Sequence, residues 1–404
     1  MPALTAQQNT RPGIDLQSQD PFATFTFMRE HHPVCQVEPN GLWAISRYQD
    51  IKNALAQPLR FSSKALDLFF QADWLSDDCK STRLIVSQDP PEHKKYHSLL
   101  NKAFVNSNIR SLMPLMRKTA KSLIDGFGTT MPVDFMSQFS YPYLGGIISQ
   151  IVGVGDKQSF VEIREWVEYE EQMSPYRPSD EFIVGCETAI RRQNTYFIEA
   201  INERRCQPQD DLLSGLIAAR IDHRALTDNE LCSLLSLMIS AGFTTTVQAI
   251  NHAIIQLSRR PEIVVQLKAS PTLIPGFIEE LLRHSPPLYA VFRIASCDIE
   301  LHGVTISKGE MVLPLLASGN RDPAHFSNPD QFDIFRKNAR QHLTFGHGIH
   351  TCIGAALARL EMHIALECLL DAFSEITCPA DHQLDWIESI SMRAVSALPV
   401  QFST

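Results

Sequence analysis

Helical periodicity dominates the pattern of apolar and polar positions along the chain. Ser159–Tyr169 has apolar and acidic residues at mixed helical spacing, and Asp180–Arg205 forms a second long amphipathic pattern after a proline-containing break. The clearest pattern covers Asp228–Arg259. These three segments predict long helices and a mainly helical protein.

The segment Asp228–Arg259 also carries start and stop signals. Thr227 and Glu230 have the spacing of a capping box, and Pro261 lies just beyond the other end. A helix of this length would be roughly 48 Å long at 1.5 Å per residue. Its middle, LCSLLSLMISAG, is apolar on all faces, which predicts a helix that is buried on every side.

Strand patterns are fewer. Gly41–Ser46, Asp298–Ile306 and Glu310–Leu316 carry β-branched or alternating residues with glycine between the segments. The C-terminal sequence MRAVSALPVQF predicts one more pair of strands. The fold class is therefore mainly α with a small β portion.

Repeats, low-complexity stretches and long linkers are absent from the 404-residue sequence. We therefore expect one domain over residues 1–404, with a short N-terminal extension, 1–20, that is loosely ordered. Apolar residues make up 44% and charged residues 20%, as in an ordinary globular protein. The net charge of −9 argues against nucleic acid and acidic membranes as partners.

The N-terminal segment has no apolar run, so it predicts neither a secretory signal nor a membrane anchor. The longest apolar stretches elsewhere in the chain, such as 144–154, are shorter than the ~20 residues needed to span a bilayer. We expect a cytoplasmic protein without a membrane partner.

Nine cysteines are scattered singly, with no CxxC pair, so in a reducing compartment each could be a metal ligand. The segment FGHGIHTCIG around Cys352 is the most informative, because its glycines allow tight turns and close approach to a flat ligand. A helical pattern with Leu357, Leu360, Ile364 and Cys368 on one face follows it. A helix N-terminus favours a thiolate, and amide hydrogen bonds to the sulfur would tune its donation to a metal.

Two other interpretations of Cys352 stay open at this point. A lone cysteine of this kind is most often a small buried residue at a helix cap. A zinc site is the other alternative, because His347 and His350 lie close in sequence, but a fourth ligand at recognisable spacing is not evident.

The pattern FxxGxxxCxG resembles the cysteine-ligand loop of the cytochrome P450 family, and the resemblance extends from about residue 40 to the C-terminus. It implies haem b with Cys352 as the axial thiolate, held between the long central helix and the cysteine-loop helix. The loop residues Phe345, Gly346 and Gly354 would contact the haem.

Glu280-Leu-Leu-Arg283 matches the ExxR pair of the same family, and Arg336 lies where the third member of that network is expected. Alone, an ExxR pair on a helix is usually a solvated ion pair. The resemblance instead implies a structural network that braces the cysteine loop.

Contacts to the haem propionates are implied for His93, Arg293 and His350. The usual histidine in such a stretch is only a surface residue. His97 stands where the family typically has an arginine, and a histidine is not reliably charged at neutral pH.

Ala241-Gly242-Phe243-Thr244-Thr245-Thr246 interrupts the apolar middle of the long helix. One interpretation is a loose spot that lets another helix approach, because glycine and threonine weaken a helix. The resemblance implies a locally widened oxygen-binding groove in which Ala241 contacts the haem and the Thr245 hydroxyl binds O₂. Thr244 occupies the position of the family's acid, which predicts poor coupling or a substrate that positions water.

Apolar residues at the expected distal side imply a substrate pocket: Phe69, Phe70, Leu288, Val291 and Met392. Such a pocket favours an apolar small molecule held by shape. The acidic residues Glu168, Glu170 and Glu171 are typical of a solvated face; attraction of a cationic substrate is the alternative.

Two basic segments oppose the overall negative charge. One contains Lys94, Lys95 and Lys102, the other Arg336, Lys337 and Arg340, and Arg359 adds to them. A charge run is usually solvated surface, but these would suit a small acidic redox protein. Because no flavin or nicotinamide fingerprint is present, we expect a ferredoxin-type donor with its reductase.

The sequence thus predicts a haem-thiolate monooxygenase that uses O₂ to oxidise an apolar small molecule. The missing acid keeps open oxidative coupling, rearrangement or peroxide-driven oxidation. An alternative of another class is a non-enzymatic haem-thiolate sensor or ligand carrier.

Overall fold

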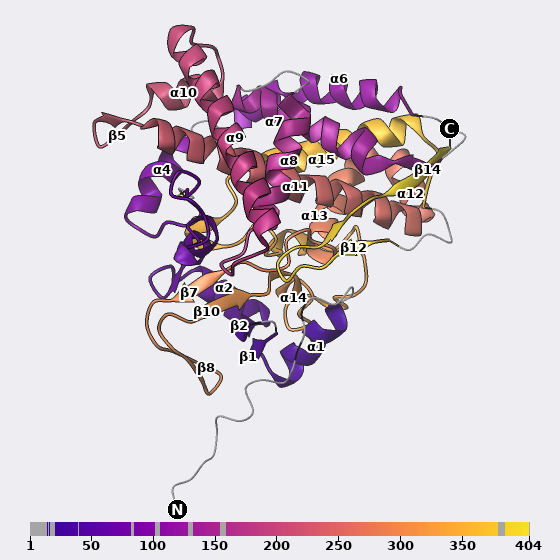
Figure 1. Ribbon diagram of the computed structural model, residues 1–404. Coiled ribbons are helices and arrows are strands. Elements are labelled where there is room, and N and C mark those ends of the chain that lie inside the picture. Colours follow the sequence, from indigo (N-terminus) through magenta and orange to yellow (C-terminus); the bar gives the residue numbers. More distant parts are fainter. Residues whose placement is uncertain are drawn as a thin grey trace, which may run out of the picture. The chain divides into compact units, whose positions relative to one another are not determined.

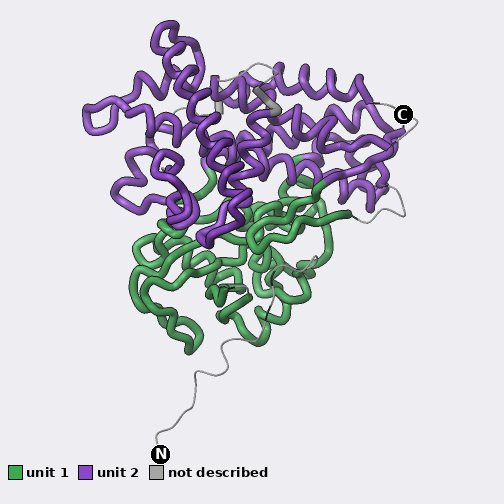
Figure 2. Tube along the Cα trace, viewed as in Figure 1, with its two compact units in different colours: residues 1–65, 275–352, 383–396 green, residues 66–274, 353–382, 397–404 purple. Residues whose placement is uncertain are grey.

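The computed structural model describes residues 14, 16, 21–38, 40–81, 85–101, 106–127, 132–153, 159–378 and 384–403. Figure 1 shows a chain dominated by helices with short strands, which confirms the predicted fold class. The chain divides into two compact units, each assembled from segments that are distant in sequence (Figure 2). Unit 1 contains residues 1–65, 275–352 and 383–396, and unit 2 contains residues 66–274, 353–382 and 397–404.

Unit 1 is built on a sheet in the order β1-β2-β10-β7-β3. β10 runs parallel to β2, with Leu313 opposite Ala44, whereas the other neighbours are antiparallel. Apolar residues from both faces are buried in two clusters, which explains why the strand residues are apolar on successive positions. The strands are β1 (Val34–Val37), β2 (Leu42–Ile45), β3 (Phe61–Ser62), β7 (Arg293–Ala295) and β10 (Met311–Pro314).

Helices and two small hairpins complete unit 1. The predicted strand region 298–306 is a hairpin of β8 and β9, with Ile299 opposite Ile306. The remaining elements are α1 (Phe22–His31), α2 (Tyr48–Leu55), α13 (Ile274–His284), α14 (Leu316–Gly319), β8 (Ile299–Leu301), β9 (Val304–Ile306), β12 (Trp386–Ile387) and β13 (Ala394–Val395), with short 3₁₀ turns at Ser63–Leu66, Ala339–Gln341 and Gly348–His350.

Unit 2 is mainly helical. Its helices are α3 (Asp67–Phe70), α4 (Glu92–Asn101), α5 (Asn106–Ser111), α6 (Met113–Ile124), α7 (Tyr141–Val152), α8 (Ser159–Glu171), α9 (Asp180–Cys206), α10 (Leu212–Ala218), α11 (Asp228–Arg259), α12 (Pro261–Ala269) and α15 (Ala355–Ala372), with a π turn at Met136–Ser140 and a 3₁₀ turn at Pro271–Leu273. Its strands are β4 (Val133–Asp134), β5 (Arg220–Ile221), β6 (Arg224–Ala225), β11 (Glu375–Thr377) and β14 (Pro399–Ser403).

The predicted central helix is confirmed as α11. Thr227 Oγ1 accepts a hydrogen bond from the Glu230 amide at 3.2 Å, and the Glu230 carboxylate accepts one from the Thr227 amide at 2.8 Å. The helices α7, α8, α9 and α15 all pack against α11 (Figure 1). Removal of its apolar side chains from water contributes about 1.5–3 kcal/mol for each large one that is fully buried.

Among the described helices, α11 alone is long and apolar enough to cross a membrane. Within its most apolar stretch, 61% is buried inside the protein. Core helices of soluble proteins meet the same criteria of length and composition.

The C-terminal strands differ from the prediction. The C-terminal segment forms two strands, but β13 pairs with β12 and β14 pairs with β11 and β4, so they do not form a pair with each other. Residues 396–398 separate the two strands, and Leu398 among them is fully buried. Most of 1–20 lies outside the described residues; Ile14 and Leu16 are described and buried in a core cluster of unit 1.

Helix α15 carries a carboxyl group deep in unit 2. Glu361 is 3% exposed, and burial raises its pKa to about 8. A raised pKa means that the folded protein retains a proton that the unfolded chain loses above about pH 4.5. This group therefore favours unfolding progressively as pH rises from there to about 8, by about 1.4 kcal/mol per pH unit.

We predict that Glu361→Gln becomes increasingly more stable than the parent between pH 5 and pH 8, because glutamine has no proton to lose. Urea unfolding at several pH values measures the difference. The exposed Glu375, changed to Gln, is the control and should show no such trend. A pH-independent difference for Glu361→Gln would contradict the buried neutral acid.

Candidate functional site

The loop that carries Cys352 is closed by its own backbone. The Cys352 amide donates to the Phe345 carbonyl at 2.8 Å, and the Gly346 amide donates to Leu343 at 2.7 Å. Gly346 and Gly348 adopt φ angles of +72° and +77°. Other residues rarely adopt this left-handed conformation, so the loop needs glycine at both positions.

Gly348 also needs to be small. A Cβ at this position would lie 2.6 Å from the Leu55 carbonyl oxygen and 3.3 Å from the Ala56 Cα. The loop therefore packs directly on the end of α2. Cys352 itself is exposed, so a rigid loop presents an accessible sulfur, as a ligand to a metal in a flat cofactor requires.

Two further residues predicted to contact the haem, His350 and Arg293, lie in unit 1 and bind different partners. His350 Nε2 is 2.9 Å from Ser63 Oγ, and buried Arg293 donates from Nη1 to the Phe292 carbonyl at 2.7 Å. Within the described part of the chain, no three His, Cys, Asp or Glu side chains gather as a metal-binding group. The zinc alternative for His347, His350 and Cys352 therefore has no supporting cluster.

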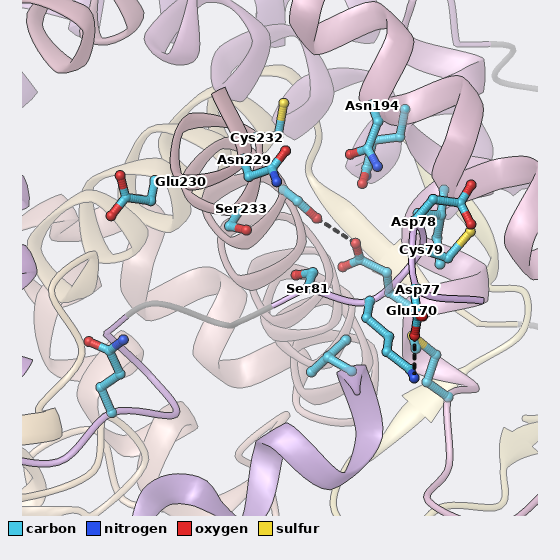
Figure 3. Close-up of a pocket in the computed structure, with 17 residues that line it drawn as sticks. Asp77, Asp78, Cys79, Ser81, Glu170, Asn194, Asn229, Glu230, Cys232 and Ser233 are labelled. Atoms are coloured by element: carbon cyan, nitrogen blue, oxygen red, sulfur yellow. Dashed lines mark hydrogen bonds and ion pairs between the residues drawn. The ribbon is translucent and has the colours of Figure 1, made fainter. Parts of the chain in front are cut away.

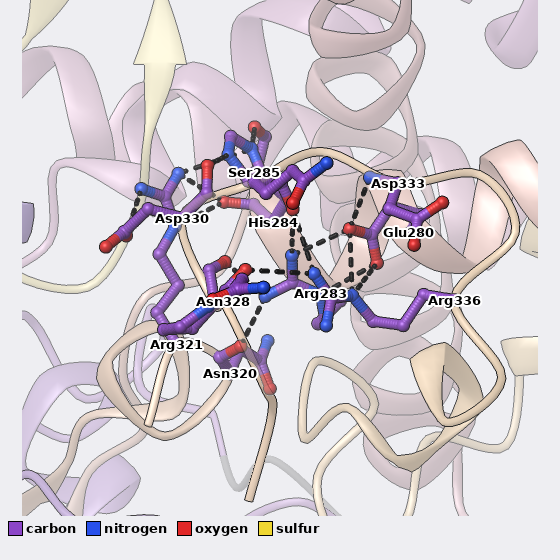
Figure 4. Close-up of polar contacts among 12 residues, drawn as sticks. Glu280, Arg283, His284, Ser285, Asn320, Arg321, Asn328, Asp330, Asp333 and Arg336 are labelled. Carbon is purple, nitrogen blue, oxygen red and sulfur yellow. Dashed lines mark hydrogen bonds and ion pairs between the residues drawn. The ribbon is translucent and has the colours of Figure 1, made fainter. Parts of the chain in front are cut away.

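The predicted ExxR residues are brought together with Arg336 (Figure 4). Both carboxylate oxygens of Glu280 accept from Arg283, each at 2.7 Å, and both also accept from Arg336 Nε at 3.1 Å. The Asp333 amide adds a bond of 2.9 Å to the same carboxylate. Glu280 and Arg283 have fully buried side chains, so one carboxylate neutralises part of the charge of two guanidinium groups inside unit 1.

The remaining guanidinium donors bind backbone carbonyls. Arg283 donates to Asn320, Pro329 and Gln331 at 2.8–3.1 Å. Arg336 Nη1 donates to Ser327 at 2.7 Å. These bonds fix the irregular chain between α14 and the cysteine loop, which has little regular secondary structure to hold it.

Asn320 connects this network to the cysteine loop. Its side chain accepts from the Leu343 amide at 2.6 Å and donates to Thr344 Oγ1 at 2.9 Å, while Thr344 donates to Leu282 on α13 at 2.6 Å. Leu343 in turn accepts from Gly346. A lone asparagine carries no spacing signal, so this role of Asn320 could not be predicted from the sequence.

We predict that Glu280→Gln destabilises the protein by about 3–5 kcal/mol, because it leaves two buried arginines without their carboxylate. Chemical unfolding measures the change. Glu300→Gln, on the exposed β8–β9 hairpin, is the matched control and should be nearly neutral. A loss below 1 kcal/mol for Glu280→Gln would refute the bracing role.

The segment predicted to form the oxygen site, residues 241–246, lies in unit 2 at the middle of α11. Ala241 is exposed although residues on both sides of this segment are buried. Thr245 donates from Oγ1 to the Ala241 carbonyl at 2.9 Å, and a Cβ at Gly242 would lie 3.4 Å from Ile148 of α7. α11 is one continuous helix through this segment, and the Thr245 hydroxyl bonds back to its own helix, so the local widening stays a prediction.

Thr244, at the position of the missing acid, is buried in unit 2. Burial raises the pKa of Glu171 to about 7, and the neighbouring Glu168 and Glu170 raise it further. Glu170 accepts from Ser236 at 2.5 Å, whereas Glu168 pairs with Arg164 at 2.7 Å. Glu168 is thus consistent with the predicted solvated face, whereas Glu170 is bound to α11.

Two residues predicted to contact the haem, His93 and His97, lie next to each other on α4. His93 is buried, and its ring centre lies 5.1 Å from that of His97. Burial and the neighbouring His97 lower the His93 pKa, although Asp89 opposes them. His97 Nδ1 lies 3.1 Å from the side-chain nitrogen, Nδ2, of Asn101.

A cavity of about 630 Å³ lies in unit 2 (Figure 3). The carboxylates of Asp77, Asp78, Glu170 and Glu230 are among the groups that line it, and Lys80 is bound to Asp77 at 2.8 Å. Its wall is more polar and acidic than the apolar roof predicted for the substrate pocket.

The predicted substrate residues are distributed over both units. Phe69 and Phe70 belong to α3 in unit 2, and Phe70 lines the acidic cavity. In unit 1, Leu288 and Met392 face each other in a β-bridge, and the Val291 amide donates to Pro314 at 3.3 Å. All five side chains are half-buried.

The basic segments are only partly available at the surface. Arg336 is held in the buried network with 6% of its side chain exposed, so its assignment to a docking patch was wrong. Lys95 pairs with Asp222 at 2.6 Å, and Lys102 lies outside the described residues. Lys94, Lys337 and Arg340 are exposed, and Arg359 is half-buried.

Comparisons with known proteins identify the family. The family model for cytochrome P450 matches residues 271–401. The chain is 32% identical over 423 residues to the mycinamicin IV hydroxylase/epoxidase of Micromonospora griseorubida, covering 98% of this chain and 99% of that protein.

Solved structures give the same result. CYP109Q5 from Chondromyces apiculatus has a TM-score of 0.87 and 31% identity, covering 98% of this chain and 99% of that one. CxnD, a P450 for C–S bond formation in chuangxinmycin biosynthesis, has a TM-score of 0.88 and 30% identity, with 98% of both chains covered. With its cysteine loop, its buried ExxR network and these relatives, the chain belongs to the cytochrome P450 family, whose members are monooxygenases with a cysteine-ligated haem b.

Proposed function

We propose that the protein inserts one oxygen atom from O₂ into an apolar small molecule, with Cys352 as the thiolate ligand of the haem iron. The observation that carries this proposal is the cysteine loop. An exposed thiol stands on a backbone that two left-handed glycines shape and that the buried Glu280 network braces. The rigidity of the loop fixes the sulfur position without help from a regular element.

The other cysteines are less suited to this role. Burial raises the thiol pKa of Cys35, Cys79, Cys186, Cys232 and Cys368, which disfavours the thiolate that a metal needs. Cys206 ends α9 and Cys297 precedes β8; both are exposed, but neither lies in a glycine loop. Exposure and loop shape together favour Cys352.

Haem, once bound, would supply the chemistry that activates O₂, and the thiolate's electron donation favours O–O cleavage. The protein's own groups would orient it. Arg293, His350 and His93 are the proposed propionate contacts, and Ser63 holds the His350 ring in place. Thr245 would provide the hydroxyl at the oxygen site.

The substrate proposal rests on the five apolar residues named for the pocket. A half-buried apolar side chain retains surface that a ligand can cover, and such surfaces bind by shape and exclusion of water. We further propose a cytoplasmic location, with electrons from a separate ferredoxin-type protein and its reductase. The enzymatic relatives favour this function over a sensor or carrier.

We predict that the reduced carbon-monoxide complex shows the strongly red-shifted Soret band of a thiolate-ligated haem. Cys352→His should lose this band while retaining some haem, because imidazole replaces the thiolate. The exposed cysteines serve as controls, and Cys206→Ser and Cys297→Ser should keep the band. A histidine-like spectrum in the parent would overturn the assignment of Cys352.

Bond formation without oxygen insertion is the second candidate function. Thr244 replaces the family's acid, and one similar structure is a P450 for C–S bond formation. Products formed under ¹⁸O₂ separate the two functions. A labelled oxygen in the product supports insertion, whereas coupled or rearranged products without label favour the alternative.

We predict that electron transfer from a ferredoxin-type donor slows as salt rises, because exposed charges are screened over about 8 Å at physiological ionic strength. Changing Lys94, Lys337 and Arg340 to Gln should weaken this salt dependence and leave substrate affinity unchanged. Lys118→Gln, a charge change outside the basic segments, is the control. Rates that do not respond to the triple change would mean that the donor docks elsewhere.

A further inference from the structure

The cavity in unit 2 is lined by α9 and α11, two helices that pack against each other (Figure 3). Each helix contributes residues spaced three or four positions apart, and therefore on one face: Asn229, Cys232, Ser233 and Ser236 from α11, and Ile190, Gln193 and Asn194 from α9. Helix faces that pack inside a protein are normally apolar. The amide and hydroxyl groups on these two faces therefore depart from the pattern of a helix core.

Several of these polar side chains are not used by the protein itself. In the described part of the chain, the side chains of Gln193, Asn194 and Ser233 have no hydrogen-bond partner. Gln193 is nevertheless only 4% exposed, and the Ser81 hydroxyl, which also lines the cavity, is buried without a partner among the described residues. An amide or hydroxyl removed from water costs about 1–3 kcal/mol unless a partner is found. The cavity thus presents groups that need polar atoms opposite them.

The carboxylates in the same wall are already committed. Three form ion pairs at 2.7–2.8 Å with basic side chains of the protein: Asp77 with Lys80, Asp78 with Arg191, and Glu230 with Arg224. Glu170 accepts a hydrogen bond from Ser236 at 2.5 Å. A cationic ligand would have to compete with these basic side chains. The groups that are left to recognise a ligand are therefore neutral.

Neutral amides and hydroxyls select a particular ligand chemistry. Each can donate or accept a hydrogen bond, so a set of them matches a ligand that carries several hydroxyl groups. Phe70, Met173 and Ile190 add apolar surface to the same cavity, which suits C–H groups. A sugar ring combines both kinds of surface. The volume of about 630 Å³ lies within the range of small-molecule sites, about 300–1,000 Å³.

The cavity and the predicted oxygen segment lie on different faces of α11. At about 100° per residue, Ala241 and Thr245 project roughly 130–170° away from the centre of the face that lines the cavity. Along the helix axis, Ser236 precedes Ala241 by roughly 7.5 Å. The cavity is therefore a neighbour of the oxygen segment and is not part of it.

We propose that this cavity is a second ligand site, separate from the haem site, that binds a neutral polyhydroxylated group of the size of a sugar ring. Gln193, Asn194 and Ser233 exchange hydrogen bonds with its hydroxyl groups, and Phe70 packs against its C–H groups. The ring comes either as a free sugar or as a substituent of the molecule that is oxidised. Binding at the site is independent of the oxidation proposed above, whereas its use by a glycosylated substrate rests on that proposed function.

The first experiment measures sugar binding without turnover. The probes are the methyl glycosides of glucose, galactose, mannose and rhamnose, detected by saturation-transfer NMR on the reduced, carbon-monoxide-bound holoprotein. We predict that at least one binds, and that Gln193→Met and Asn194→Leu each weaken its affinity about fivefold, because each removes an amide but retains the approximate shape of the side chain. Asn202→Leu, an exposed change on α9 outside the cavity, is the matched control and should bind like the parent.

A second comparison separates the two sources of the sugar. The octyl glycoside of the sugar that binds, its methyl glycoside and 1-octanol are each titrated while the haem spin state is recorded. A sugar carried by the substrate predicts a spin-state shift by the octyl glycoside at a lower concentration than by 1-octanol, and Asn194→Leu should remove this advantage. A free sugar predicts equal affinity for the methyl and octyl glycosides, without that advantage. Both results retain the site.

Other outcomes would overturn the proposal. One is that none of the four methyl glycosides binds the parent, and another is that the sugar binds Gln193→Met and Asn194→Leu as tightly as it binds the parent. Tighter binding of octyltrimethylammonium than of the glycosides, lost in Asp78→Asn, would also refute it, because the carboxylates would then recognise the ligand. If Gln193→Met does not fold, Ser233→Ala takes its place in the comparison. A parent without the red-shifted Soret band would refute the assignment of Cys352 and leave sugar binding to be measured, so the two failures are distinguishable.

Discussion

Burial of charge at Glu280 is the constraint on which unit 1 depends. A carboxylate removed from water costs several kcal/mol unless its charge and lone pairs are satisfied. Here Arg283 and Arg336 satisfy it, and their remaining donors must in turn find acceptors. Those acceptors are backbone carbonyls of an irregular segment, so the need to solvate one ion cluster determines the path of a chain without regular structure.

This constraint reaches the cysteine loop in a few steps. Arg283 fixes the Asn320 carbonyl, the Asn320 side chain fixes Leu343, and Leu343 accepts from Gly346 within the loop. The position of Cys352 therefore depends on a set of short, directional contacts rather than on packing alone. Such an arrangement suits an axial ligand, because packing and supporting hydrogen bonds together hold a functional side chain to within about 0.5 Å.

A feature could be predicted from the sequence where a single physical requirement produces a pattern among neighbouring residues. The bounds of α11 followed from a capping box and a proline, and the tight turns of the cysteine loop followed from the glycines around Cys352. Contacts made across the chain left no such pattern. Asn320 is an ordinary polar residue whose partners are distant in sequence, so only the folded chain reveals what it contacts. Arg336 shows the same limit, since a basic run in sequence does not tell a buried cation from a surface one.

Glu280 and Glu361 illustrate how one protein accommodates a buried carboxyl group in two ways. The Glu280 carboxylate accepts hydrogen bonds from Arg283, Arg336 and the Asp333 amide, so its partners satisfy it inside unit 1. Glu361 lies within the core of unit 2, where burial alone raises its pKa to about 8, and the group reduces stability as pH increases. A buried carboxyl group can therefore brace a fold only where cationic and amide partners accompany it, because burial without them opposes ionisation.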